Sequence, residues 1–132
     1  MNVNLLPGGF TVCQLPDLSG FDSGSDAPDA VPFFLARTGS EISLVCRTTR
    51  VPRITVARED GWSLFRVEGP LDFGLVGILS SLTGTLAAAG IPVFAVSTFD
   101  TDYLLVHTDR LTETLTAWRA AGHRVEEDLE SM

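Results

Sequence analysis

The chain has 132 residues, of which 45% are hydrophobic and 20% are charged, and its formal net charge is −8. This length and composition are typical of one globular domain, or of two small domains that share a core, and not of a disordered chain. The negative charge and the absence of a Lys/Arg cluster disfavour nucleic acid and anionic membranes as partners, because binding to either depends on basic residues that neutralise phosphates.

The N-terminal segment and the two cysteines are typical of a cytoplasmic protein. Residues 1–7 have neither the basic region nor the long apolar core of a signal peptide, and no apolar run is long enough to span a bilayer. Cys13 and Cys46 each lie in an apolar, strand-like run, without the close spacing or companion histidines of a zinc or redox motif. We therefore expect buried structural thiols and a cytoplasmic protein.

The N-terminal half predicts strands but no regular helix. The runs from Pro16 to Pro32 and from Glu59 to Gly61 have the composition of a loop and a turn; the first carries four aspartates among serines, glycines and prolines. Runs rich in branched, aromatic and other apolar residues predict four strands, of which the middle two form a hairpin about Thr38-Gly39-Ser40: residues 9–15, 33–37, 41–46 and 54–57.

The C-terminal half begins with a predicted strand at 62–67, followed by a helix. Apolar residues recur at intervals of three and four, which is the period of one helix face. They are Phe73, Val76, Leu79, Leu82 and Leu86. The sequence Gly90-Ile91-Pro92 predicts the end of this helix, because glycine readily takes a left-handed conformation and proline cannot continue a helix.

The remaining predicted elements are three strands and a second helix. Strands are predicted at 93–96 and 103–106, and a last short strand at 123–126. Between them, Thr108 or Asp109 is expected to cap a second helix, which presents Leu111, Leu115 and Trp118 on one face and ends at Gly122. The order βαββαβ predicts an α+β, ferredoxin-like fold, in which two helices cover one face of a four-stranded sheet.

The two halves suggest a tandem arrangement and an assembly. Because the first half repeats the order of strands without full helices, we interpret residues 1–60 as a degenerate copy and residues 61–132 as the regular domain, packed as one unit. In the regular domain, apolar residues alternate onto both faces of the sheet, whereas the helices cover only one face. We therefore expect the chain to form a homodimer.

Two polar joints are the candidate site. One, Gly69 to Gly77, connects the first strand to the first helix, and the other, Ser97 to Tyr103, connects the second strand to the third. If the joints meet, Asp100 or Asp102 can hold a ligand ammonium, while the backbone N–H groups that open the helix near Phe73 face a carboxylate. Gly74 and Gly77 would then allow a ligand to approach the backbone closely.

Simpler interpretations of these residues stay open. Asp72 could merely cap the helix, and Asp100 could merely form the hairpin turn. Asp100-Thr101-Asp102 also matches a short metal-binding sequence, but three residues are a weak signal and no phosphate clamp accompanies them. A small enzyme that uses Asp100 or Asp102 as a base is the alternative function, although no nucleophile motif is visible. No metal and no cofactor are expected.

These segments resemble a known family. Gly69-Pro70-Leu71-Asp72-Phe73, Gly90-Ile91-Pro92-Val93-Phe94 and Ser97-Thr98-Phe99-Asp100-Thr101-Asp102-Tyr103 are similar to the small bacterial ACT-domain proteins related to the cytosolic arginine sensor CASTOR. The resemblance implies tandem ACT folds and a regulatory protein without catalysis, which binds an amino acid or related metabolite near these two joints and acts on an unidentified partner protein. With Phe73 and Asp100 from the reasoning above, the predicted ligand-binding residues are Asp72, Phe73, Gly74, Gly77, Thr98, Phe99, Asp100 and Asp102.

Overall fold

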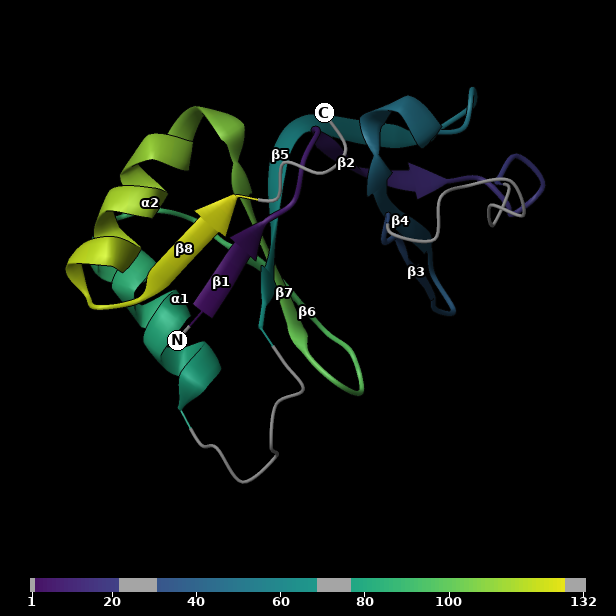
Figure 1. Cartoon of the computed structure of the whole chain (residues 1–132). Helices are drawn as coiled ribbons and strands as arrows, with labels where there is room; N and C mark the ends of the chain where they lie inside the picture. The colour runs from purple at the N-terminus through teal and green to yellow at the C-terminus, as the bar shows by residue number, and fades with distance from the viewer. Residues whose placement is uncertain (1, 22–30, 69–76, 128–132) are drawn as a thin grey trace. The chain divides into compact units, whose positions relative to one another are not determined.

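The computed structural model describes residues 2–21, 31–68 and 77–127, and the chain divides into two compact units (Figure 1). Unit 1 combines Met1–Pro7 with Ser63–Met132, and unit 2 is Gly8–Trp62. The long strand β5 (Ala57–Val67) begins in unit 2 and continues into unit 1. The sequence predicted a division between residues 60 and 61. The chief difference is that the first seven residues belong with the C-terminal unit.

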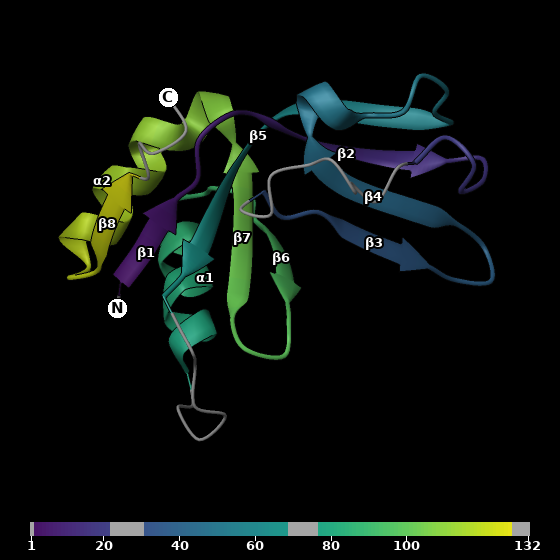
Figure 2. The same cartoon turned by 45° about the vertical axis from the view of Figure 1, so that its right-hand side comes forward.

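Unit 1 contains the predicted ferredoxin-like fold. Its sheet has the order β6-β7-β5-β1-β8, and its helices α1 and α2 lie on one face of that sheet (Figure 2). The order along the chain from β5 is strand, helix, strand, strand, helix, strand, which confirms the predicted α+β class. The elements other than β5 are β1 (Asn2–Leu5), α1 (Ile78–Ala88), β6 (Phe94–Ser97), β7 (Asp102–His107), α2 (Leu111–Ala120) and β8 (Arg124–Glu127).

Strand β1 is a difference from the four-stranded sheet that the sequence predicts. It lies between β5 and β8, antiparallel to the first, with Val3 opposite Val67, and parallel to the second, with Val3 opposite Val125. Its flanks are fixed by backbone hydrogen bonds from Leu6 N to Leu64 O at 2.9 Å and from Glu68 N to Asn2 O at 2.8 Å. A strand of four residues has little periodicity of its own, so only its distant partners define it.

The helices end where the sequence predicts. After α1, Gly90 has a φ of +72°, and Ile91 N donates to Leu86 O at 2.9 Å, which is the hydrogen bond of a Schellman motif. After α2, Gly122 has a φ of +94°, and His123 N donates to Trp118 O at 3.0 Å.

The expected start of the second helix was wrong. Thr108 and Asp109 belong to a short 3₁₀ turn, Thr108–Arg110, which leads into α2 without any side-chain cap. Such a turn satisfies part of the first helical turn through the backbone, so the hydroxyl and carboxylate are not needed there.

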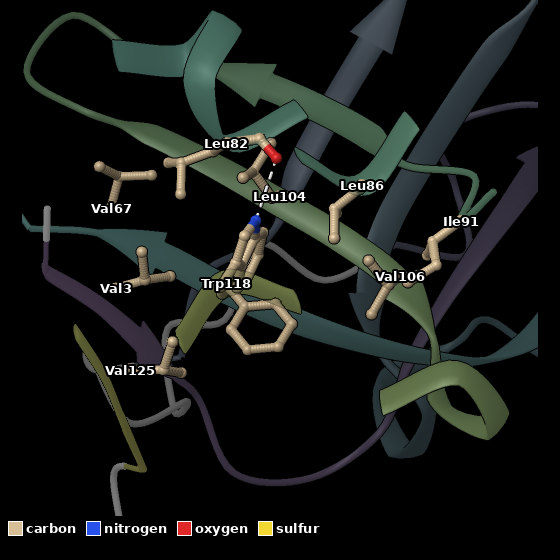
Figure 3. Packing of buried hydrophobic residues seen from close by; sticks show 10 residues of the cluster. Val3, Val67, Leu82, Leu86, Ile91, Leu104, Val106, Trp118 and Val125 are labelled. Carbon is tan, nitrogen blue, oxygen red and sulfur yellow. Dashed lines mark hydrogen bonds between the residues drawn. The ribbon is translucent and has the colours of Figure 1, made fainter. Parts of the chain in front are cut away.

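Trp118 is the centre of the unit 1 core. Its side chain is fully buried, and its ring meets the ring of Phe65 edge to face, with the centroids 4.9 Å apart (Figure 3). The indole Nε1–H donates to Leu82 O at 3.0 Å, so the polar atom of this large side chain is satisfied inside the core. Buried residues of the strands, of α1 and of the segment after α1 surround it: Val3, Val67, Leu82, Leu86, Ile91, Leu104, Val106 and Val125.

Unit 2 is a small sheet in the order β3-β4-β2-β5. Its hairpin is as predicted: β3 (Phe34–Arg37) and β4 (Ile42–Arg47) pair antiparallel, and Thr38 N donates to Glu41 O at 2.9 Å. Strand β2 (Phe10–Leu15) pairs with β4, and the 3₁₀ turn Thr48–Arg50 follows. The described part of unit 2 contains no α-helix. Its interpretation as a degenerate copy of unit 1 stays a prediction.

The expected strand at 54–57 and turn at Glu59-Asp60-Gly61 were wrong. Residues 54–56 precede β5, and the three turn-like residues lie inside it. There, the pairing of β5 with β2 shifts by one residue between Phe10 and Val12, and Gly61 has a φ of +87°. The register shift therefore indicates a β-bulge rather than a turn, and glycine suits it because glycine readily adopts a positive φ.

The two cysteines are free and buried, as expected for structural thiols. Both belong to the small core of unit 2, together with Leu15 and Leu44. Burial raises the pKa of Cys46 to about 12 and also raises the pKa of Cys13. The neutral thiol is therefore the form present at physiological pH, and it packs as a small apolar side chain.

His123 makes the stability of the fold dependent on pH. Burial lowers the pKa of this imidazole, whose Nε2 lies 3.3 Å from Ser81 Oγ. Below the unfolded pKa of about 6.5, the unfolded chain binds a proton that the folded chain takes up only at lower pH. Stability is thus reduced as the pH falls through this value and is complete above it. We expect His123→Gln to melt closer to the wild type at about pH 5.5 than at about pH 7.5. Thermal melts of both proteins at the two pH values give the difference in melting temperature between them. The same difference at both pH values would contradict the prediction.

Candidate functional site

The hairpin between β6 and β7 is closed by threonines. Ser97 pairs with Asp102, and inside this pair Thr98 N and Thr98 Oγ1 both donate to Thr101 O, at 2.8 and 2.9 Å. Thr101 N donates to Thr98 Oγ1 at 3.2 Å. The turn therefore depends on Thr98, and the simpler interpretation of Asp100 as the turn-forming residue is not needed.

The carboxylates of the two hairpin aspartates, Asp100 and Asp102, are available to a ligand. Asp100 is exposed, whereas Asp102 is half-buried at the start of β7. Among the described residues, neither carboxylate has a hydrogen-bond or ion-pair partner. Phe99, between Thr98 and Asp100, is 82% exposed. Two carboxylates and an aromatic ring on one loop can hold a cation through ion pairs and through the ring face.

A hydroxyl fixes this hairpin against the end of β5. Thr101 Oγ1 donates to Val67 O, so the start of β7 lies beside the last residue of β5. Just after the other end of β7, Thr108 Oγ1 lies 2.9 Å from Ser63 Oγ, which belongs to β5. Glu68, the residue after β5, directly precedes the joint from Gly69 to Gly77. The hairpin therefore lies beside the end of β5, the strand that precedes the strand-to-helix joint.

Contacts from β1 hold the end of β5 on its other side. Asn4 Nδ2 donates to Glu68 Oε1, in addition to the backbone hydrogen bond between Glu68 and Asn2. Sequence reasoning missed both Thr101 and Asn4 as residues that position the site. The alternation of asparagine with apolar residues in Asn2–Leu5 was the available signal for Asn4; Thr101 offered none beyond its place between the aspartates.

The helix side of the site is described only at Gly77. This residue precedes α1, has a φ of +92° and accepts a hydrogen bond from Ser81 N at 2.8 Å. A Cβ added here would meet no atom within 4 Å, so the backbone angle and not lack of space favours glycine. Figures 1 and 2 place the start of α1 and the hairpin tip at the same end of unit 1. Asp72, Phe73 and Gly74 lie outside the described residues, and their part in the site stays a prediction.

Two features were not found in the described part of the chain, a cluster of metal-ligating side chains and a membrane-spanning helix. Within residues 2–21, 31–68 and 77–127, no group of three or more His, Cys, Asp or Glu side chains is placed to hold a metal ion. Neither of the two described helices is long and apolar enough to cross a bilayer.

Comparison with known proteins identifies the family. Residues 57–119 match the ACT domain family. The chain is 32% identical over 95 residues to the "Cytosolic arginine sensor for mTORC1 subunit 1" of Homo sapiens and to that of Pongo abelii. Each match covers 66% of this chain and 29% of the relative. The chain therefore spans less than a third of the length of these curated relatives.

Solved structures extend the likeness over nearly the whole chain. Protein Atu0741 from Agrobacterium tumefaciens is 32% identical with a TM-score of 0.81, over 96% of this chain and 92% of that one. Protein VC0802 from Vibrio cholerae (18% identity, TM-score 0.62, 90% and 88% covered) and the aspartate kinase of Clostridium acetobutylicum (12%, 0.61, 87% and 33%) share the fold. The match of residues 57–119 and the 32% identity to the arginine sensors show an ACT-domain protein that is related to the cytosolic arginine sensor.

Proposed function

We propose that this chain is a regulatory protein that binds an amino acid or a related small metabolite between the β6–β7 hairpin and the β5–α1 connection, and that it has no catalytic activity of its own. The observation that carries the proposal is the hydrogen bond from Thr101 to Val67, which brings the hairpin to the end of β5. The name of the arginine-sensing relatives supports an amino acid as the ligand.

The chemistry of the hairpin favours a ligand with a positive charge. Asp102 is half-buried, and an ion pair to a partly desolvated carboxylate is stronger than one at a fully exposed position. We assign Asp102 to the ammonium or guanidinium of the ligand, with Asp100 and Phe99 as outer contacts. The N–H groups at the start of α1, with Gly77 in front of them, are the proposed donors to the ligand carboxylate. Asp72, Phe73, Gly74 and Thr98 complete the proposed site.

A thermal-shift screen against the twenty amino acids, followed by calorimetry, tests the function. A ligand present at a hundred times its dissociation constant stabilises the folded state by about 2.7 kcal/mol. We expect a cationic amino acid to raise the melting temperature and to be recovered unchanged after prolonged incubation. Stabilisation by none of the twenty would refute the amino-acid ligand. Conversion of the bound amino acid into a product would instead favour the alternative, a small enzyme with Asp100 or Asp102 as base.

We also propose that the chain forms a homodimer. Strand β6 is at the edge of the unit 1 sheet, its residues are largely exposed, and Phe94 on it is 38% exposed. A sheet edge with an exposed aromatic residue is readily covered by the same edge of a second copy. Light scattering should give twice the mass of the chain at micromolar concentration, and Phe94→Lys should shift the population toward monomer. A wild-type monomer at that concentration would contradict the proposal.

A cytoplasmic location is the last part of the proposed function. The relative is named a cytosolic sensor, and Cys13 and Cys46 are both unoxidised in the structure. Free thiols are typical of a reducing compartment. The partner protein that such a sensor would regulate is not specified by these residues.

A further inference from the structure

A second candidate site lies in unit 2. The turn that follows β2 and the segment that precedes β5 lie side by side (Figures 1 and 2), and Val56 N donates to Gln14 O at 2.8 Å. Between them is an open cavity of ≈ 410 Å³, within the size range of small-molecule sites. It is lined by Leu15, Pro16, Asp17, Ser19, Gly20, Pro52, Arg53 and Ile54. None of these residues was part of the predicted site.

The floor of this cavity is apolar. Leu15 is 3% exposed and belongs to the unit 2 core, and Pro52 is also buried. Ile54, by contrast, lines the cavity with 74% of its surface exposed. Burial of apolar surface contributes about 25 cal/mol per Å², so a branched apolar group seated over these three residues would be stabilised by its contact with Ile54.

The rim carries one charge of each sign. Among the described residues, the guanidinium of Arg53 has no hydrogen-bond or ion-pair partner. Asp17 Oδ1 accepts hydrogen bonds from Ser19 N at 2.9 Å and from Ser19 Oγ at 2.6 Å, and these bonds lower the pKa of the carboxyl group. Asp17 is therefore anionic at neutral pH and holds the turn, whereas the donors of Arg53 are available to a ligand.

We propose that this cavity binds a small monocarboxylate with a branched apolar tail, the carboxylate on Arg53 and the tail over Leu15, Pro52 and Ile54. A guanidinium matches a carboxylate with two parallel hydrogen bonds. The nearby Asp17 carboxylate repels a doubly charged anion more strongly than a singly charged one, which disfavours phosphate esters. This site is separate from the proposed hairpin site, and it does not depend on the function assigned to unit 1.

Three probe compounds separate the contributions of the ligand groups. In two-dimensional amide NMR of the full chain, 4-methylpentanoate should give saturable shifts at Gly20, Arg53 and Ile54. Leucine should do the same, because it keeps the carboxylate and the tail, while 3-methylbutylamine, which lacks the carboxylate, should not. Equal shifts with the amine, or no saturation with 4-methylpentanoate at millimolar concentration, would overturn the proposal.

Substitution of the arginine tests the assignment. Arg53→Gln should weaken 4-methylpentanoate binding at least about tenfold, because a hydrogen bond to a charged group is lost. Arg37→Gln, an exposed arginine at the end of β3 that does not line the cavity, is the matched control and should bind as the wild type does. Asp102→Asn should also leave this binding unchanged, so that failure of the hairpin site and failure of this site are distinguishable. Unaltered affinity in Arg53→Gln would exclude Arg53 as the anion ligand.

Discussion

Replacement of Trp118 by alanine should lower the free energy of unfolding by about 3–5 kcal/mol, a large part of the stability of a small protein. The substitution removes a fully buried indole, its edge-to-face contact with Phe65 and its hydrogen bond to Leu82 O. It leaves a cavity between α1 and the sheet, and it removes the additional donor to Leu82 O, a carbonyl within α1. Urea denaturation followed by circular dichroism measures the change.

Two further variants show which part of Trp118 is responsible. Trp118→Phe keeps most of the ring volume but removes the N–H that donates to Leu82 O, and loss of this hydrogen bond should cost about 0.5–1.5 kcal/mol. Phe99→Ala removes an aromatic side chain that is 82% exposed, and it should change stability by less than about 0.5 kcal/mol. If Trp118→Ala destabilised the chain no more than Phe99→Ala does, Trp118 would not be the centre of the core.

Replacement of Asp102 by asparagine should weaken the binding of a cationic amino acid by about tenfold to a hundredfold, because a hydrogen bond to a charged group contributes roughly 1.5–3 kcal/mol. The amide has nearly the shape of the carboxylate but not its charge. The side chain has no other partner among the described residues, so the unliganded protein should melt near the wild-type temperature. Calorimetry with the amino acid found by the thermal-shift screen gives the affinity.

Two aspartates provide the comparison for this variant. Asp100→Asn, at the exposed tip of the same hairpin, should reduce affinity less, since solvent screens its charge. Asp109→Asn lies in the 3₁₀ turn after β7, at the opposite end of that strand, and should have no effect on affinity. Unchanged affinity in Asp102→Asn would show that Asp102 is not the cation ligand; a larger loss in Asp100→Asn would assign that role to Asp100 instead.

The elements of unit 1 could be predicted because their signals are local. The apolar spacing of Leu82 and Leu86 places one face of α1 in the core, and Gly90 and Gly122 end the two helices through backbone angles that other residues tolerate poorly. The hairpin residues from Thr98 to Asp102 were likewise recognisable as a polar loop between two apolar strands. Periodicity and turn chemistry act within a few residues, so the sequence carries them directly.

Other features were decided by the tertiary structure. The place of β1 depends on Val3 pairing with Val67 and Val125, and the bulge at Gly61 appears only when β5 is aligned with β2. The hydrogen bond that holds the hairpin against the end of β5 links Thr101 to Val67 across 34 residues of chain. A strand or a hydroxyl has the same local pattern whichever partner it meets. Its partner is selected by the packing and hydrogen bonding of the whole unit, which local periodicity does not encode.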